Sequence, residues 1–205
     1  MKVSLENLDQ LAWEKQEGLI PAIIQDTNSG VLLMQAYMNI ESLKQTLETG
    51  LVTFYSRSRQ TLWQKGEISG NTLQCVEIVA DCDQDSLKIL AEPSGPVCHT
   101  GTATCWDDGG QPRLSFLTRL EAVIDSRRDA SPESSYTAKL HQRGSKYIAQ
   151  KVGEEAVETA LAAVAGDDKE FLDESSDLLY HLLVLINSRD LKLTDVVETL
   201  RKRHQ

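Results

Sequence analysis

The 205-residue sequence has no apolar run that approaches the roughly 20 residues a membrane-spanning helix needs. Its N-terminus also lacks the basic-then-apolar order that is typical of a secretory signal peptide. Both absences argue against export and against membrane insertion. We therefore expect a cytoplasmic protein with no membrane partner.

Basic residues are fewer than acidic ones. The sequence has 21 Lys and Arg against 31 Asp and Glu, which gives a formal net charge of −10 at pH 7. A nucleic-acid-binding surface normally carries a basic patch, so this balance argues against a nucleic-acid partner. Phosphorylated ligands are then expected to bind through divalent cations together with a few placed Lys and Arg side chains.

Cysteine is also scarce, with four residues in the chain. Four cysteines could form two disulfides in a secreted protein, but without an export signal the thiols stay reduced, and metal binding explains them better. Three of the four, Cys82, Cys98 and Cys105, fall within the single stretch Asp81–Cys105. This stretch is the strongest candidate for a site in the first half of the chain.

Three carboxylates open this stretch. The β-branched, apolar run Val76–Ala80 predicts a strand that leads into Asp81, and alternate side chains of an extended chain share one face. Asp81, Asp83 and Asp85 would then point one way and Cys82 the other. Carboxylate oxygens suit Mg²⁺ and thiolates suit Zn²⁺, so the alternation predicts two metals at one strand end.

The remaining cysteines extend the zinc prediction. Cys98 and Cys105 could complete a three-thiolate site whose open fourth position is the catalytic arrangement. The alternative interpretation is structural: Asp81–Asp85 would be a polar turn, the cysteines small buried residues, and His99 an ordinary surface or core histidine.

The first half of the sequence predicts a sheet-rich fold. In chain order we expect a short helix over Leu5–Trp13, strands over Leu19–Gln25 and Val31–Met38, a helix over Glu41–Thr49, and strands over Leu51–Tyr55, Leu73–Ala80 and Ser86–Leu90. The first two strands should form a hairpin, and Asn39 and Gly50 should cap the helix between strands. The whole predicts a mainly antiparallel sheet.

Two polar loops follow the third strand. Charged, hydroxyl and amide side chains in such loops can hold phosphate and ribose, and a solvated loop is the equally plausible alternative. The candidate ligands in these loops are Arg57, Arg59, Lys65, Glu67, Ser69 and Asn71.

The second half of the sequence predicts helices alone. The turn-rich segment Asp107–Pro112 predicts a linker, so we expect domains over residues 1–112 and 113–205. Apolar spacing then predicts helices over Leu114–Ile124, Ser135–Ala165, Asp168–Ser188 (capped by Asp167) and Thr194–Arg203 (capped by Thr194). The fold class is therefore a β-rich α+β metal-binding domain followed by an all-α domain.

A second set of acids lies on the predicted helices. Glu154, Glu155 and Glu158 are spaced three or four residues apart, as are Glu174 and Asp177 on the next helix. If these helices packed antiparallel, the carboxylates would meet and could hold Mg²⁺, with phosphates completing the coordination. Basic side chains one to three turns earlier could contact phosphate, namely Arg143, Lys146 and Lys151. The alternative is an acidic, solvated helix face.

Several sequence patterns resemble known families. The patterns Gly66–Asn71 (GEISGN), Asp81–Asp85 (DCDQD) and Cys98–Gly101 (CHTG) followed by Cys105 resemble the phosphoribosyl-AMP cyclohydrolases. The patterns Ser135–Thr137 (SYT), Lys151–Glu158 (KVGEEAVE) and Glu174–Asp177 (ESSD) resemble the phosphoribosyl-ATP pyrophosphatases, which are all-α nucleotide pyrophosphohydrolases. In this order they resemble the bifunctional proteins of histidine biosynthesis.

The resemblance implies two hydrolytic reactions. The second domain would hydrolyse phosphoribosyl-ATP to phosphoribosyl-AMP and pyrophosphate, and the first would open the adenine ring of phosphoribosyl-AMP at the N1–C6 bond with a zinc-activated water. The implied catalytic residues are His99, Glu155 and Glu158, with His99 as the candidate base.

The resemblance also implies the metal ligands and a partner. Zinc would be held by Cys82, Cys98 and Cys105, and Mg²⁺ by Asp81, Asp83 and Asp85 in the first domain and by Glu154, Glu155, Glu158, Glu174 and Asp177 in the second. The zinc site of this family is shared across a dimer, so a homodimer is expected. Two other interpretations compete: a general nucleoside triphosphate pyrophosphohydrolase with a structural zinc module, and a non-enzymatic scaffold that binds nucleotides.

Overall fold

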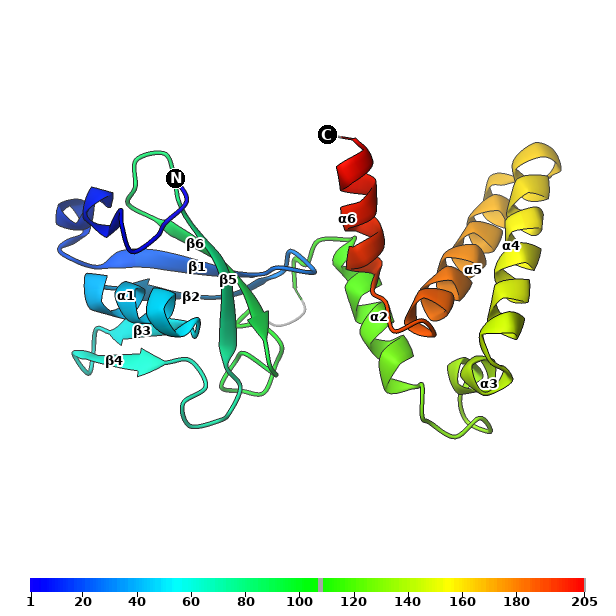
Figure 1. The fold of residues 1–205 in the computed structure, drawn as a ribbon, viewed down its shortest axis with the longest axis horizontal. Helices are drawn as coiled ribbons and strands as arrows, with labels where there is room; N and C mark the ends of the chain where they lie inside the picture. Colours follow the sequence, from blue (N-terminus) through cyan, green and yellow to red (C-terminus); the bar gives the residue numbers. More distant parts are fainter. Residues whose placement is uncertain (107–108, 205) are drawn as a thin grey trace. The chain divides into compact units, whose positions relative to one another are not determined.

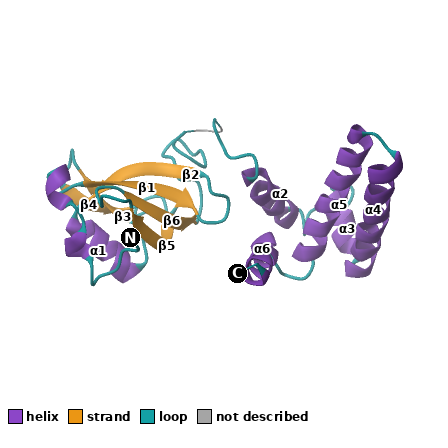
Figure 2. Cartoon of the chain, turned by 90° about the horizontal axis from the view of Figure 1, so that it is seen from above, coloured by secondary structure: helices purple, strands orange, loops and turns teal. Residues whose placement is uncertain are grey.

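The computed structural model describes residues 1–106 and 109–204, and the chain divides into two compact units, Met1–Ser115 and Phe116–Gln205. The first unit is rich in strands and the second is entirely helical in its described residues, which confirms the predicted fold class (Figure 2). Two residues of the predicted linker, Asp107 and Asp108, lie outside the described residues. Among the helices that are described, none is both long and apolar enough to cross a bilayer.

The first unit is built on a four-stranded sheet with the order β2-β1-β6-β5 (Figure 1). Its elements are β1 (Ile20–Asp26), β2 (Leu32–Met38), α1 (Ile40–Thr49), β3 (Thr53–Ser56), β4 (Thr61–Gln64), β5 (Leu73–Ala80) and β6 (Leu87–Pro93). The strands pair antiparallel except β1 with β6, which run parallel, and β3 and β4 form a separate two-stranded sheet. The mainly antiparallel prediction and the β1–β2 hairpin are therefore confirmed.

Helix α1 is fixed by both of its ends. The side chain of Asn39 accepts a hydrogen bond from the Ser42 backbone N–H (2.8 Å), while the Ser42 hydroxyl accepts one from the Asn39 N–H (3.0 Å). Gly50 ends the helix in the left-handed conformation (φ 73°), which glycine adopts without steric cost. Leu43 then faces the core formed by the inward side of the sheet.

Two predictions in this unit were wrong. The segment predicted as one helix over Leu5–Trp13 forms two short 3₁₀ helices, Leu8–Gln10 and Trp13–Gln16, because backbone hydrogen bonds to the sheet unit hold it, including Ala12 N–H to the Gln84 carbonyl. The residues of β4 were predicted as loop. They form a strand because they pair with β3, and the Trp63 ring of β4 packs against the Phe54 ring of β3.

The second unit comprises α2 (Ser115–Ser126), α3 (Tyr136–Arg143), α4 (Ser145–Ala165), α5 (Asp168–Asn187) and α6 (Leu193–Arg203). Helices α4 and α5 lie side by side, joined through Gly166 and Asp167 (Figures 1 and 2). A small core of Ile124, Leu140, Ile148, Leu183 and Val184 joins α2, α3, α4 and α5. Asp167 caps α5 as predicted, because its carboxylate accepts a hydrogen bond from the Glu170 N–H (2.9 Å).

The helix predicted over Ser135–Ala165 is broken in two. Gly144 adopts φ 81° and ψ 167°, a conformation that leaves the helical region and turns the chain between α3 and α4. The cap predicted at Thr194 is also wrong. Helix α6 begins one residue earlier, and Asp195 accepts a hydrogen bond from the Lys192 N–H (2.8 Å) at its start.

Candidate active sites

The turn between β5 and β6 brings three carboxylates together. Asp81, Asp83 and Asp85 each place an oxygen within 4.8 Å of the others, a spacing that could hold a metal ion. The predicted cluster therefore forms, although its predicted cause was wrong, since the segment is a turn and not an extended strand end. The Asp81 carboxylate accepts hydrogen bonds from the N–H groups of Asp85 (3.1 Å) and Ser86 (3.2 Å), which bends the chain onto itself.

Lys15 supplies the countercharge of this acidic turn. Its ammonium group lies 2.8 Å from Asp83 and 3.6 Å from Asp85. The hydrogen bond with Lys15 lowers the pKa of the Asp83 carboxyl, and it raises the pKa of Lys15 in turn. No pattern in the sequence indicates this contact, because the two partners are 68 residues apart.

A cavity of about 480 Å³ opens at the other end of the β5–β6 pair. Among its lining residues are these predicted site residues: Arg59, Lys65, Glu67, Ser69, Asn71, Cys98, His99 and Cys105. Lys65 is buried, and its ammonium group donates a hydrogen bond to the Asn71 carbonyl (3.3 Å). Arg57 does not line the cavity. Its guanidinium instead lies over the Tyr37 ring, 3.9 Å from the centroid.

Within this cavity Cys98 is set up as a thiolate. The Thr100 hydroxyl donates a hydrogen bond to the Cys98 sulfur (3.1 Å), and this bond is the main reason that the pKa of Cys98 falls to about 6. The pKa of Cys105 is raised by burial and by the neighbouring Cys98 sulfur. His99 Nδ1 lies 3.7 Å from the Cys98 sulfur, next to the same cavity. Two sulfurs and an imidazole therefore meet at one wall.

Cys82 does not join the other two cysteines within one chain. The described residues contain no three-cysteine group with metal-ligand spacing. Cys82 lies in the β5–β6 turn, whereas Cys98 and Cys105 lie in the loop after β6, and Cys105 N–H is bonded to the Leu33 carbonyl near that end of the sheet. The seven residues of β6 separate the two ends by roughly 20 Å at about 3.3 Å per residue. The strand-end zinc site predicted from spacing alone is therefore wrong for a single chain.

The second acidic site lies between α4 and α5. Glu155, Glu158 and Glu174 place oxygens within 4.8 Å of one another, so the predicted antiparallel packing brings three of the candidate ligands together. Burial, followed by the charges of Glu158 and Glu155, raises the pKa of the Glu174 carboxyl. Glu154 and Asp177 lie outside this three-oxygen group. A divalent cation would relieve the repulsion among these carboxylates.

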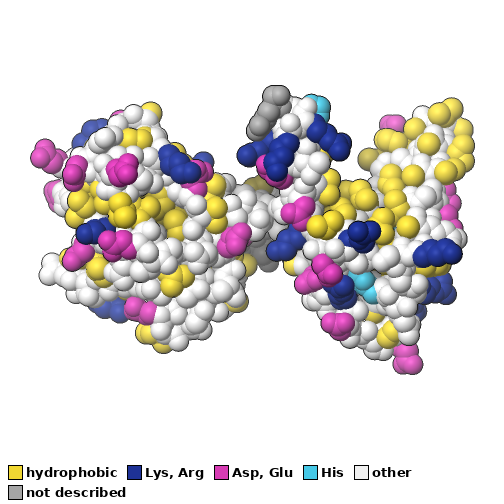
Figure 3. Space-filling model, in the orientation of Figure 1, with side chains coloured by type: hydrophobic (Ala, Val, Ile, Leu, Met, Phe, Trp, Pro, Cys, Tyr) yellow, Lys and Arg dark blue, Asp and Glu magenta, His cyan; other side chains and the backbone are white. Residues whose placement is uncertain are grey.

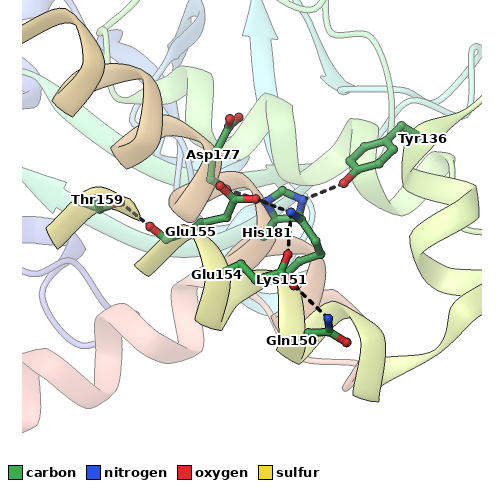
Figure 4. A network of polar contacts seen from close by, with 8 residues as sticks. All are labelled: Tyr136, Gln150, Lys151, Glu154, Glu155, Thr159, Asp177 and His181. Carbon is green, nitrogen blue, oxygen red and sulfur yellow. Dashed lines mark hydrogen bonds and ion pairs between the residues drawn. The ribbon is translucent and has the colours of Figure 1, made fainter. Parts of the chain in front are cut away.

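Lys151 occupies the edge of this site (Figure 4). Its ammonium group lies 2.8 Å from Glu155 and 2.9 Å from Glu154, and these contacts raise the pKa of Lys151 well above its usual value. Glu154 also accepts a hydrogen bond from Gln150 (2.8 Å), and both donors lower its pKa, Lys151 more strongly. Lys151 is therefore close enough to the acids to contact a phosphate bound there.

The two other predicted phosphate ligands of this domain lie further away. Lys146 precedes Glu155 by nine residues of α4, which corresponds to about 14 Å at 1.5 Å per residue. Arg143 ends α3 and lies over the Tyr147 ring, 4.4 Å from its centroid. The site residues predicted from the sequence also omitted His181, whose Nδ1 lies 3.5 Å from Glu155 Oε1, and Tyr136, whose hydroxyl lies 3.0 Å from His181 Nε2.

The two carboxylate groups and the cavity offer ligands of distinct chemistry. The group Glu155, Glu158 and Glu174 and the group Asp81, Asp83 and Asp85 present hard carboxylate oxygens, which suit Mg²⁺. The cavity presents two thiol sulfurs, one of them with a lowered pKa, which suit Zn²⁺. The residues present therefore fit the metals that the sequence predicted.

Comparison with known proteins agrees with this division. The chain matches the family model of phosphoribosyl-AMP cyclohydrolase over residues 34–107 and that of phosphoribosyl-ATP pyrophosphohydrolase over residues 117–204. The histidine biosynthesis bifunctional protein HisIE of Vibrio cholerae is 53% identical over 199 residues, covering 96% of this chain and 95% of that protein. HisIE of Escherichia coli K12 is 56% identical over 196 residues, covering 96% of each, and HisIE of Photobacterium profundum is 55% identical over 197 residues, covering 94% and 95%.

Fold, sites and matches together define a chain with two separate hydrolase domains. The chain belongs to the family of bifunctional histidine-biosynthesis proteins that carry a phosphoribosyl-AMP cyclohydrolase domain and a phosphoribosyl-ATP pyrophosphohydrolase domain. The resemblance inferred from the sequence patterns is thereby confirmed.

Proposed function

We propose that this chain catalyses two consecutive hydrolyses, and we assign residues 113–205 to the first and residues 1–112 to the second. The helical domain would hydrolyse phosphoribosyl-ATP to phosphoribosyl-AMP and pyrophosphate. This proposal is supported by the cluster of three carboxylates from Glu155, Glu158 and Glu174, with the Lys151 ammonium group beside it. When bound, Mg²⁺ neutralises phosphate charge and positions the attacking water.

The residues of the helical site have different proposed roles in metal binding, water orientation and phosphate binding. Glu155, Glu158 and Glu174 would hold the cation, with Glu154 and Asp177 as further candidate ligands. Glu155 and Glu158 also orient the water. Lys151, whose ammonium group lies 2.8 Å from Glu155, would contact the triphosphate bound beside these acids. Lys146 lies about 14 Å from Glu155 along α4, and Arg143 ends the preceding helix α3, so both are assigned to a distal phosphate.

The sheet-rich domain would open the adenine ring of phosphoribosyl-AMP by hydrolysis of the N1–C6 bond. Support comes from the cavity that joins Cys98, His99 and Cys105. Zinc would be held by these two cysteines and Cys82, and when bound it lowers the pKa of a coordinated water. His99 would accept the proton of the attacking water, and substitution at N1 makes the purine cationic and so prone to attack at C6.

The polar lining of the cavity would bind the rest of this substrate. Arg59, Lys65, Glu67, Ser69 and Asn71 face the ribose and phosphate, as lining residues of the same cavity. Arg57, held over Tyr37, is placed at the rim. The shared zinc site proposed below would bring the β5–β6 turn of a second chain to this cavity, and magnesium held there by that chain's Asp81, Asp83 and Asp85 would contact the substrate's phosphate.

The active protein is a homodimer that shares its zinc sites in this proposal. Cys82 and the pair Cys98 and Cys105 lie at opposite ends of β6, so a second chain is needed to complete the ligand set. The helical unit offers further support. Exposed apolar side chains gather on α4 and α5 near their connection (Figure 3), among them Val157, Leu161, Val164, Phe171 and Leu172. The cytoplasmic location stays a prediction.

Two variants test the assignment of the two reactions. With phosphoribosyl-ATP, Mg²⁺ and Zn²⁺ supplied, Cys98→Ser should abolish the ultraviolet change of ring opening and leave pyrophosphate release intact. Glu155→Gln should stop pyrophosphate release and still open the ring of added phosphoribosyl-AMP. Equal loss of both activities in a folded variant would contradict separate sites. A wild-type chain that releases pyrophosphate from ordinary nucleoside triphosphates and never opens the ring would favour the general pyrophosphohydrolase with a structural zinc module.

A further inference from the structure

A buried histidine contacts the acidic site from α5. His181 is only 4% exposed, and its ring makes three polar contacts (Figure 4). Nε2 lies 3.0 Å from the Tyr136 hydroxyl, and Nδ1 lies 2.9 Å from the Asp177 backbone carbonyl and 3.5 Å from Glu155 Oε1. Glu155 is itself 5% exposed. A carboxylate that is so deeply buried needs partners to fix its direction.

The hydrogen-bond partners define which ring nitrogen carries the proton. A backbone carbonyl only accepts, so Nδ1 must donate to Asp177 O. In the neutral ring Nε2 is then the acceptor, and the Tyr136 hydroxyl donates to it. The Nδ1–H group therefore faces both the Asp177 carbonyl and Glu155 Oε1. The second distance is too long for a strong hydrogen bond, and it serves as an orienting contact.

The Lys151 ammonium group and the His181 ring contact the same carboxylate oxygen of Glu155. Lys151 lies 2.8 Å from Oε1, the same atom that faces His181. Within the described part of the chain, the polar contacts of this carboxylate are made at Oε1. The other oxygen, Oε2, makes no such contact with the described residues and can accept a ligand, and Glu158, three residues further along α4, is one of the acids grouped with Glu155.

We propose that His181 and Tyr136 are positioning residues for the pyrophosphohydrolase site. Tyr136, from the first turn of α3, fixes the ring of His181 on α5, and the ring holds the Glu155 carboxylate of α4 in the orientation that binds a divalent cation. Partners behind a metal ligand commonly govern its affinity in this way. The proposal rests on the proposed role of Glu155 as a metal ligand.

The chain offers a matched control. The Tyr180 hydroxyl is hydrogen-bonded to Thr137 Oγ1 (2.8 Å), so it joins the same two helices, one residue away on each. Tyr180→Phe removes the same atom as Tyr136→Phe and leaves both the His181 ring and Glu155 with their polar contacts. A general loss of packing between α3 and α5 would affect both variants alike.

The test compares Tyr136→Phe, His181→Asn, Tyr180→Phe and Glu155→Gln in the full-length protein. One readout is the Mg²⁺ concentration that half-saturates pyrophosphate release, taken together with kcat at saturating Mg²⁺. The second readout is calorimetric titration with Mn²⁺ in the absence of substrate. The Mn²⁺ binding that is seen in the wild-type protein and lost in Glu155→Gln is assigned to the helical site. We expect Tyr136→Phe and His181→Asn to weaken cation binding by about 10- to 100-fold in both readouts. High Mg²⁺ should restore much of kcat in Tyr136→Phe.

Each other outcome has one meaning. If Tyr136→Phe and Tyr180→Phe weaken cation binding equally, or if neither Tyr136→Phe nor His181→Asn weakens it, the positioning role is refuted. If Glu155→Gln itself keeps full Mn²⁺ binding and pyrophosphate release, the proposed metal site is wrong. The failure of the positioning role and the failure of the metal site are thereby distinguished.

Discussion

Two inactive variants of this protein should restore each other's ring-opening activity when combined. Cys82 lies in the β5–β6 turn, and Cys98 and Cys105 lie roughly 20 Å away beyond β6, so in the proposed dimer each zinc site would draw on two chains. In a mixed dimer of Cys82→Ser and Cys98→Ser chains, one site lacks both residues and the other is intact. Random pairing makes half of the dimers mixed, each with one of two sites intact, so about a quarter of wild-type activity should return in a symmetric dimer.

The assay mixes the two variants under conditions that exchange subunits and follows the ultraviolet change of ring opening. Pyrophosphate release, from the other domain, serves as the control and should be unaffected in each variant and in the mixture. Zinc content should rise in parallel, to about half an ion per mixed-dimer chain in a symmetric dimer. Differently tagged chains show that mixed dimers have formed. Mixed dimers without activity, or a Cys82→Ser protein that binds zinc and opens the ring alone, would refute the shared site.

Three further substitutions test individual contacts. Lys151→Met leaves the buried Glu155 carboxylate without its neighbouring ammonium group, so the free energy of unfolding, measured with urea in the presence of a chelator, should fall by about 1.5–3 kcal/mol. Mg²⁺ should stabilise the variant more than it stabilises the wild-type protein. Equal unfolding midpoints in urea would contradict this prediction. Asn39→Ala removes the α1 cap and should cost about 1 kcal/mol in the same unfolding assay, with both metal sites unaltered. In zinc-free protein the Cys98 thiol has a pKa of about 6, compared with the ordinary 9.0. Its reactivity toward iodoacetamide should therefore fall with decreasing pH with a midpoint at about pH 6. Thr100→Val should move this midpoint upward, because the lost hydrogen bond favours the thiolate, and an unmoved midpoint would argue against that cause.

Local patterns in the sequence were enough to predict much of the fold. The cap and stop of α1 at Asn39 and Gly50 depend on neighbouring backbone groups, so they could be recognised from a few residues. The spacing of Glu155 and Glu158 similarly reports one helix face. The prediction failed at Gly144, where one residue with a positive φ divides a segment whose composition is helical throughout.

The sequence by itself determined the two-domain division and the residue types that supply oxygen and sulfur ligands, because these follow from composition and short-range spacing. The family was inferred separately, from motifs that resemble those of known enzymes. The tertiary structure decided which of those ligands meet. It joined Glu155 to Glu174 across two helices and brought Lys15 to Asp83, and it placed Cys82 at the opposite end of a strand from Cys98. Such contacts join residues far apart in the chain, and their distances are set by packing and strand register, which no local pattern encodes.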